Sequence, residues 1–156
     1  MKRLITYCLC AVAMALCLSC SSNDEEVAPE KSYNKLIVGS WYEYIFETYI
    51  NGELDDIVYF DDNEMSIRGY VETYFSDGTG RWREYNLEDN VDVNDFFSWE
   101  IIGTSLVTKV KDGDEYYVSK GDIIELTNEK LIISYTFINY NGDTEKEVSY
   151  FKRYKD

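Results

Sequence analysis

Between Phe96 and Ile138 the chain reads FFSWEIIGTSLVTKVKDGDEYYVSKGDIIELTNEKLIISYTFI. Apolar side chains recur at every second position in parts of this stretch, first at Phe97, Trp99 and Ile101, and again from Leu131 to Phe137. Successive side chains of a β-strand point to opposite faces, so this alternation predicts strands with one buried face. Short turn sequences separate the alternating segments: Gly103-Thr104, Asp112-Gly113-Asp114 and Asn128-Glu129. The stretch therefore predicts antiparallel strands joined by tight turns.

The same punctuation continues on both sides of this stretch, at Asn51-Gly52, Ser76–Gly80 and Asn141-Gly142-Asp143. Asn-Gly is a signal for a type I′ hairpin, and no window of the chain shows a sustained helical period. We predict an all-β domain, an up-and-down antiparallel meander of about eight to ten strands that closes into a barrel to remove its edges. The segment Asp55–Gly69 is compatible with a strand, a loop or one short helix.

Several short motifs occur at matching places in this meander. They are Gly39-Ser40-Trp41 at the first strand, the Asp77-Gly78-Thr79 turn, Trp99–Gly103 with Leu106, and Tyr150–Tyr154 at the end. Together they resemble the lipocalin-like domains of bacterial lipoproteins, over the span from Leu36 to Tyr154. Asp55–Gly69 and Glu88–Asp95 look like insertions relative to that family.

This resemblance implies a closed barrel with Trp41 plugging one end. It also implies that a basic residue of the last strand, Arg153 or Lys152, covers the indole in a cation–π contact. Gly39, Trp41 and Arg153 would then close the barrel and bind no ligand. Lipocalins carry small apolar molecules, and an eight-stranded barrel has room for one of them. The resemblance thus implies a non-enzymatic binding module for a small apolar or amphipathic ligand.

The first residues predict export. Lys2 and Arg3 give a positive start, and the apolar run Leu4–Leu18 is shorter than the roughly 20 residues of a membrane-spanning helix. Leu16–Cys20 resembles the lipobox of bacterial lipoprotein precursors, in which the cysteine is acylated. We therefore expect residues 1–19 to be a signal peptide and Cys20 to be the lipidation site, carrying fatty acids such as palmitate. The alternative is an ordinary signal peptide with an accidental cysteine at the cleavage site.

The organisation downstream of Cys20 follows from composition. All four cysteines lie at or before position 20, so the mature chain would keep only the anchor. Residues 20–32 are polar and charged and are expected to form a flexible tether, with residues 33–156 as the barrel domain. Acidic residues after the anchor resemble an export tag of Gram-negative lipoproteins. We expect a lipid anchor in the bacterial outer membrane and display at the cell surface.

Charge and composition exclude several classes of function. The chain has 30 acidic and 15 basic residues, a net charge of −15 that becomes −17 when Lys2 and Arg3 leave with the signal peptide. Such a surface repels nucleic acid. The chain has no histidine, which removes the commonest general base and the usual zinc ligand. No enzymatic activity, cofactor or catalytic residue is predicted.

Two groups of carboxylates could either form a functional site or simply be exposed to solvent. The acidic clusters Asp55-Asp56, Asp61–Glu64 and Asp112–Glu115 could hold calcium, but their spacing fits no calcium loop and solvated turns are expected, so we predict no metal site. Glu43 and Glu47 share the strand phase of Trp41 and Ile45. They could line the cavity as an acid/base pair, or a bulge could turn the glutamates outward.

Aromatic residues make up 16% of the chain, and most of them suit strands and cores. Exposed ones could instead form a platform for a glycan or a protein partner. Trp82, between Arg81 and Arg83, is the leading candidate for exposure. The second hypothesis is therefore a surface interaction protein with a filled barrel. A continuous apolar cavity opening opposite Trp41 would favour the ligand-binding hypothesis.

Overall fold

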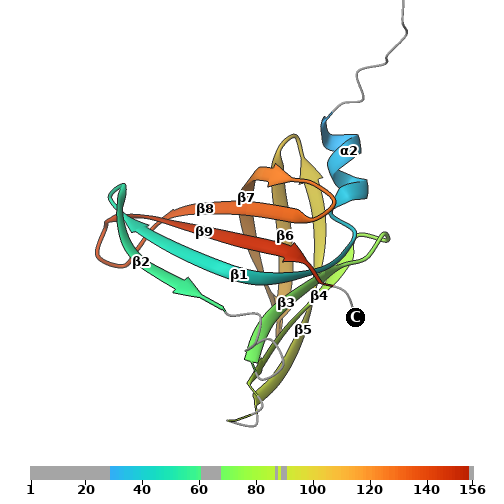
Figure 1. The fold of residues 1–156 in the computed structure, drawn as a ribbon, viewed down its shortest axis with the longest axis horizontal. Coiled ribbons are helices and arrows are strands. Elements are labelled where there is room, and N and C mark those ends of the chain that lie inside the picture. The colour runs from blue at the N-terminus through green and yellow to red at the C-terminus, as the bar shows by residue number, and fades with distance from the viewer. Residues whose placement is uncertain (1–28, 61–67, 87, 89–90, 155–156) are drawn as a thin grey trace, which may run out of the picture.

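The computed structural model describes residues 29–60, 68–86, 88 and 91–154. The predicted signal peptide and Cys20 lie outside these residues. Within them, one helix, α2 (Pro29–Leu36), precedes nine strands (Figure 1). The strands are β1 (Gly39–Ile50), β2 (Glu53–Tyr59), β3 (Arg68–Tyr74), β4 (Thr79–Asn86), β5 (Val91–Ile102), β6 (Ser105–Asp112), β7 (Glu115–Leu126), β8 (Lys130–Ile138) and β9 (Thr144–Arg153). The predicted all-β meander of eight to ten strands is confirmed.

The sheet closes because the first and last barrel strands pair. Its order is β2-β1-β3-β4-β5-β6-β7-β8-β9, every pairing is antiparallel, and β1 also pairs with β9. On its other edge β1 pairs with β3 through residues 39–42 and with β2 through residues 45–50. Eight strands therefore form the barrel, and β2 is an extra strand on the second half of β1.

The segment that the sequence left open begins as a strand. β2 covers Glu53–Tyr59, and residues 61–67 lie outside the described part of the chain. The expected Asn-Gly hairpin joins it to β1, since Asn51 and Gly52 both have positive φ, 52° and 87°. A two-residue turn of this type matches the twist of the strands that it joins.

Helix α2 corrects the prediction of a flexible tether up to residue 32. Residues 29–32 form the first half of the helix. Proline suits the first turn of a helix because its φ is already helical and no hydrogen bond is required of its missing N–H. Eight residues are also too few to produce a clear helical period. Tyr33 and Leu36 of the helix pack against the core of the barrel.

The core lies at the end of the barrel that α2 covers. Its fully buried side chains are Ile37, Trp41, Tyr74, Leu106, Leu131 and Ile133. A second, smaller cluster of Tyr42, Val71 and Tyr85 packs on the outer face of β1, β3 and β4. Toward the opposite end the strands spread apart, because β7 pairs with β8 only from residue 122 to residue 126 (Figure 1).

Candidate functional site

The closed end of the barrel is built on Trp41 and Arg153, which are register partners on β1 and β9. The Arg153 guanidinium carbon lies 3.8 Å from the centre of the indole ring. Its Nη1 and Nη2 donate to the carbonyl oxygens of Val38 and Leu36 at 2.8 and 2.7 Å. Trp41 is fully buried, and its Nε1 donates to the Ile37 carbonyl at 2.7 Å. One guanidinium thus joins the indole to the end of α2.

Gly39 and Lys152 occupy different places around this contact. Gly39 has φ +122°, and a Cβ there would lie 2.5 Å from Nη1 of Arg153, so a side chain would displace the guanidinium. Lys152 points to the other face of β9, with its Nζ 5.5 Å from the ring centre of Tyr42 and 5.6 Å from that of Tyr44. Of the two basic residues considered for the indole, the structure puts Arg153 there.

A cavity of about 360 Å³ lies on the open side of this core, inside the barrel. All eight barrel strands contribute to its wall. Phe97 and Phe151 belong to both the core cluster and the cavity wall, so they separate the plugged end from the open one. A continuous apolar cavity was the feature expected to favour ligand binding, but three carboxylates line this one: Glu43, Glu72 and Glu147.

A bulge in β1 decides which glutamates face the cavity. The register with β9 shifts between Glu43 and Ile45, so Tyr44 is an extra residue. Glu43 stays on the inner face with Trp41, while Glu47 moves to the outer face, where Tyr49 and Tyr150 donate hydroxyl hydrogen bonds to it at 2.8 and 2.9 Å. The hypothesis of a Glu43–Glu47 pair inside the barrel is therefore wrong, because a bulge reverses the alternation of side chains.

The inner carboxylates are held in a poorly solvated setting. Burial raises the pKa of Glu43 to about 7; a hydrogen bond with Ser149 opposes this rise, and the negative charges of Glu72 and Glu147 add to it. Burial also raises the pKa of Glu72, which accepts hydrogen bonds from the hydroxyls of Tyr70, at 3.2 Å, and Tyr74. These groups favour the protonated form more than exposed carboxylates do.

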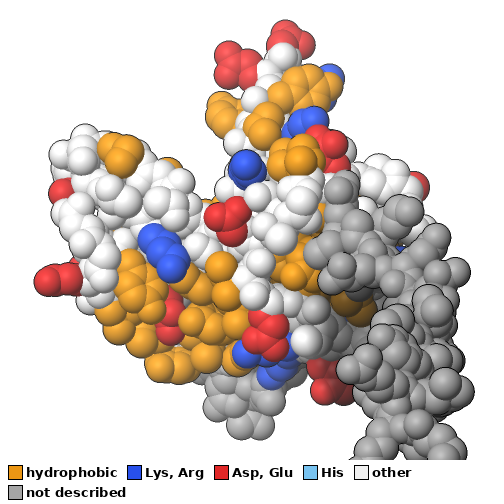
Figure 2. All heavy atoms as spheres, turned by 90° about the horizontal axis from the view of Figure 1, so that it is seen from above, with side chains coloured by type: hydrophobic (Ala, Val, Ile, Leu, Met, Phe, Trp, Pro, Cys, Tyr) orange, Lys and Arg blue, Asp and Glu red, His pale blue; other side chains and the backbone are white. Residues whose placement is uncertain are grey.

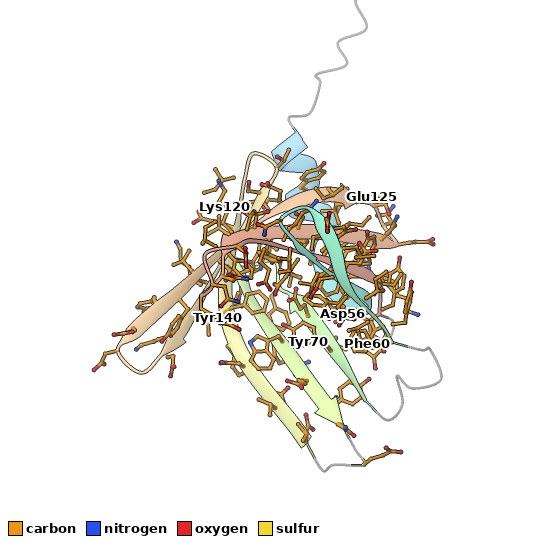
Figure 3. The ribbon with its side chains drawn as sticks, turned by 90° about the vertical axis from the view of Figure 1, so that its left-hand side faces the viewer. Asp56, Phe60, Tyr70, Lys120, Glu125 and Tyr140 are labelled. Atoms are coloured by element: carbon orange, nitrogen blue, oxygen red, sulfur yellow. The ribbon has the colours of Figure 1, made fainter. Side chains whose placement is uncertain are left out.

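Aromatic rings complete the wall. Tyr70 and Trp82, on neighbouring strands, stack with ring centres 6.0 Å apart and planes 25° apart. Figure 3 shows Tyr70 among the side chains inside the barrel, whereas Tyr140 lies at the β8–β9 turn. Trp82 lines the cavity too, which corrects its expected exposure. Its polar neighbours Arg81 and Arg83 face outward, because side chains alternate along β4.

The other sequence candidates show no converging chemistry. Asp55 and Asp56 are exposed in the middle of β2, and Asp112 and Asp114 are exposed at the β6–β7 turn. Residues 61–64 lie outside the described ranges. Among the residues that the structure describes, no three His, Cys, Asp or Glu side chains come together as a metal site.

None of the described helices is both long enough and apolar enough to cross a membrane. Exposed apolar side chains gather on one face in Figure 2.

Sequence reasoning missed Glu72 and the inward position of Trp82. Glu72 is polar and Trp82 has polar neighbours, so the pattern of alternating hydrophobic residues did not identify either as facing inward. The available signal was the phase Tyr70, Glu72, Tyr74, which places Glu72 on the same face as two aromatic residues. The inward position of Glu72 could have been predicted from the aromatic residues two positions before and two positions after it.

Comparison with known proteins agrees with the architecture. No protein-family model matches the chain, and no curated protein matches it in sequence. A lipocalin-like protein from Bacteroides uniformis superposes with a TM-score of 0.50 at 13% identity, over 76% of this chain and 98% of that one. Lobster apocrustacyanin A1 superposes with a TM-score of 0.51 at 10% identity, over 88% and 73%. At this identity the likeness concerns the fold alone, and the fold is that of a lipocalin-like β-barrel.

Proposed function

We propose that the domain is a non-enzymatic binding module that holds one small amphipathic molecule inside its barrel. The observation that carries this proposal is the cavity of about 360 Å³, whose wall combines aromatic rings with carboxylates. Small-molecule sites are concave, mostly pre-formed and supplied with a few polar groups that orient the ligand. The lipocalin-like fold supports the proposal, since a barrel of eight strands has room for one small ligand.

The competing hypothesis is a filled barrel that binds a glycan or a protein through exposed aromatics. Some aromatic side chains are indeed exposed, among them Tyr59, Phe96, Tyr116, Tyr117 and Tyr140. A filled barrel would not leave a cavity of this size between Phe97 and the open end. The cavity therefore favours the binding module.

Blocking the cavity tests the proposal. Thr108 lines the cavity from β6, whereas its neighbour Lys109 points outward and is exposed. We expect the neutral fluorescent dye N-phenyl-1-naphthylamine to bind the wild-type protein and the Lys109→Trp control. Thr108→Trp should lose at least about tenfold in affinity while its circular dichroism spectrum stays the same. Equal binding of the dye by the three proteins would contradict a ligand site inside the barrel.

We also propose that lipid on Cys20 anchors the module to the bacterial outer membrane. The proposal rests on Ser19-Cys20 at the end of the apolar run and on the lack of any later cysteine. Since α2 joins the barrel at its closed end, the open end of the cavity would then face away from the anchor. Cys20→Ala should move the protein from the membrane fraction to the soluble fraction. Continued membrane association and fatty-acid labelling of Cys20→Ala would contradict the assignment.

A further inference from the structure

The cavity wall carries three acidic side chains, and no Lys or Arg whose side chain the structure describes lines it. The acidic residues are Glu43, Glu72 and Glu147. Glu43 is only 9% exposed, and its negative charge is repelled by those of the other two. A buried carboxylate that lacks a positive partner is costly. The carboxylates therefore lack a positive partner among the described side chains, and protons or a cationic ligand can compensate their charge.

The basic residues of β9, a strand of the cavity wall, make contacts outside the cavity. Arg153 lies over Trp41 at the closed end. Lys152 lies over the outer rings of Tyr42 and Tyr44. The Lys146 Nζ is 5.7 Å from the centre of the Tyr49 ring. None of these three side chains therefore brings its positive charge into the cavity.

The aromatic part of the wall is also suited to a positively charged group. Trp82 and Tyr70 stack on each other, and Phe97 and Tyr135 also line the cavity. The faces of aromatic rings attract cations, most strongly when the cation is removed from water. An ammonium group would thus meet carboxylates and ring faces in one cavity.

The size and spread of the wall favour an organic cation over a metal ion. A metal ion needs several oxygen ligands within about 2.0–2.6 Å of one point, and no three acidic side chains of the described chain converge in that way. The three glutamates come instead from β1, β3 and β9, around a volume of about 360 Å³. That volume is near the lower end for small-molecule pockets.

We propose that the cavity binds a small organic cation, a protonated amine on an aromatic or apolar body. Its ammonium group lies among Glu43, Glu72 and Glu147, and its body packs against Tyr70 and Trp82. This inference rests on the proposed binding function and names the ligand class of the same cavity.

Three indoles that differ mainly in the charge of the side chain provide the test. Tryptamine carries an ammonium group, tryptophol a neutral hydroxyl group and indole-3-acetate a carboxylate. Isothermal titration calorimetry at pH 8 with the full barrel domain should show tryptamine binding at least about tenfold more tightly than tryptophol, because a charged hydrogen bond is gained. Indole-3-acetate should bind more weakly than either. Calcium chloride should not compete.

Matched variants assign the effect to the inner face. Glu43→Gln keeps the size of the side chain and removes its charge, and Glu47→Gln does the same on the outer face of the same strand. Tryptamine affinity should fall about tenfold in Glu43→Gln and stay unchanged in Glu47→Gln, with tryptophol affinity equal in both. If Glu43→Gln does not fold, Glu147→Gln, which is half-buried, replaces it with the same expectation.

The outcomes separate this inference from the binding function. Tryptophol binding as tightly as tryptamine, or an unchanged tryptamine affinity in Glu43→Gln, overturns the cation and leaves the binding module. Binding of the neutral dye with no binding of any indole does the same. Competition by calcium would replace the organic cation with a metal ion. If neither the dye nor an indole binds, both proposals fail.

Discussion

At the closed end of the barrel, Arg153 touches the Trp41 ring and also donates hydrogen bonds to the carbonyl of Leu36, the last residue of α2, and to that of Val38. Truncating a buried tryptophan costs about 3–5 kcal/mol, and a partly desolvated cation–π contact contributes about 1–2 kcal/mol. We expect Trp41→Ala to lower the free energy of unfolding more than Arg153→Ala does. The double variant should lose less than the sum, because the two residues interact directly.

Urea denaturation of the four proteins measures this coupling. Lys109→Ala serves as the control, since Lys109 forms an exposed ion pair with Glu100 and such pairs contribute about 0–1 kcal/mol. Strictly additive losses for Trp41 and Arg153 would show that the contact contributes nothing to stability.

The Glu43 carboxyl predicts how stability depends on pH. Burial raises its pKa from 4.5 to about 7, so the fold favours the protonated form. Its contribution is fully present below pH 4.5 and is lost as the pH rises through about 7. The loss approaches about 3 kcal/mol at pH 8. Glu43→Gln, which cannot ionise, should therefore be more stable than the wild type at pH 8 and similar to it at pH 4.5.

Urea midpoints at the two pH values test this expectation. Glu72 and Glu147 face the same cavity, and burial raises their pKa as well, so the variant should keep part of the pH dependence. Tyr70 and Tyr135 also face it, but burial raises the pKa of both further above neutrality. A Glu43→Gln protein that is less stable than the wild type at pH 8 would contradict the expectation that the ionised Glu43 carboxylate destabilises the fold.

At the scale of strands, Gly80 shows how closely β4 approaches a ring of the core. It is buried opposite Phe97 of β5, and a Cβ built on Gly80 would collide with the Phe97 ring. Gly80→Ala should therefore cost about 1–3 kcal/mol of stability, the usual penalty for overpacking. Adding Phe97→Leu should recover part of the loss in chemical denaturation. A neutral Gly80→Ala would mean that the ring moves freely.

The strands themselves could be predicted from the sequence because their alternation is regular. Phe97, Trp99 and Ile101 face inward as expected, while Ser98 and Glu100 are exposed. The inner face of β1 could not be derived, since the bulge at Tyr44 has no marker such as glycine or proline. The sequence pattern around it fits either phase of the strand equally well.

The cavity was harder to predict than the barrel. Hydrophobic periodicity finds side chains that leave water for the core, but Glu43 and Glu72 lie inside the barrel for another reason. They depend on hydroxyl partners, Ser149 for the first and Tyr70 and Tyr74 for the second. Ser149 lies over a hundred positions away in the sequence, so only the closed sheet reveals that pairing.

The whole domain needs no covalent cross-link. Residues 21–156 contain no cysteine, so stability comes from the closed sheet and its core. We expect a β-type circular dichroism spectrum and a melting temperature that a reductant does not change. A melting temperature lowered by reductant, or a spectrum dominated by helix, would contradict this expectation.

The pairing of β1 with β9 also determines when the chain can fold. Glu47 and Tyr150, which bond across this pair, are 103 positions apart. Contacts so distant must overcome the entropy of closing a long loop, and proteins dominated by them fold in roughly milliseconds to seconds. Until Thr144–Arg153 has left the ribosome, β1 and β8 each lack their β9 partner. The nascent chain therefore cannot become a closed barrel before β9 has been made and has reached both β1 and β8.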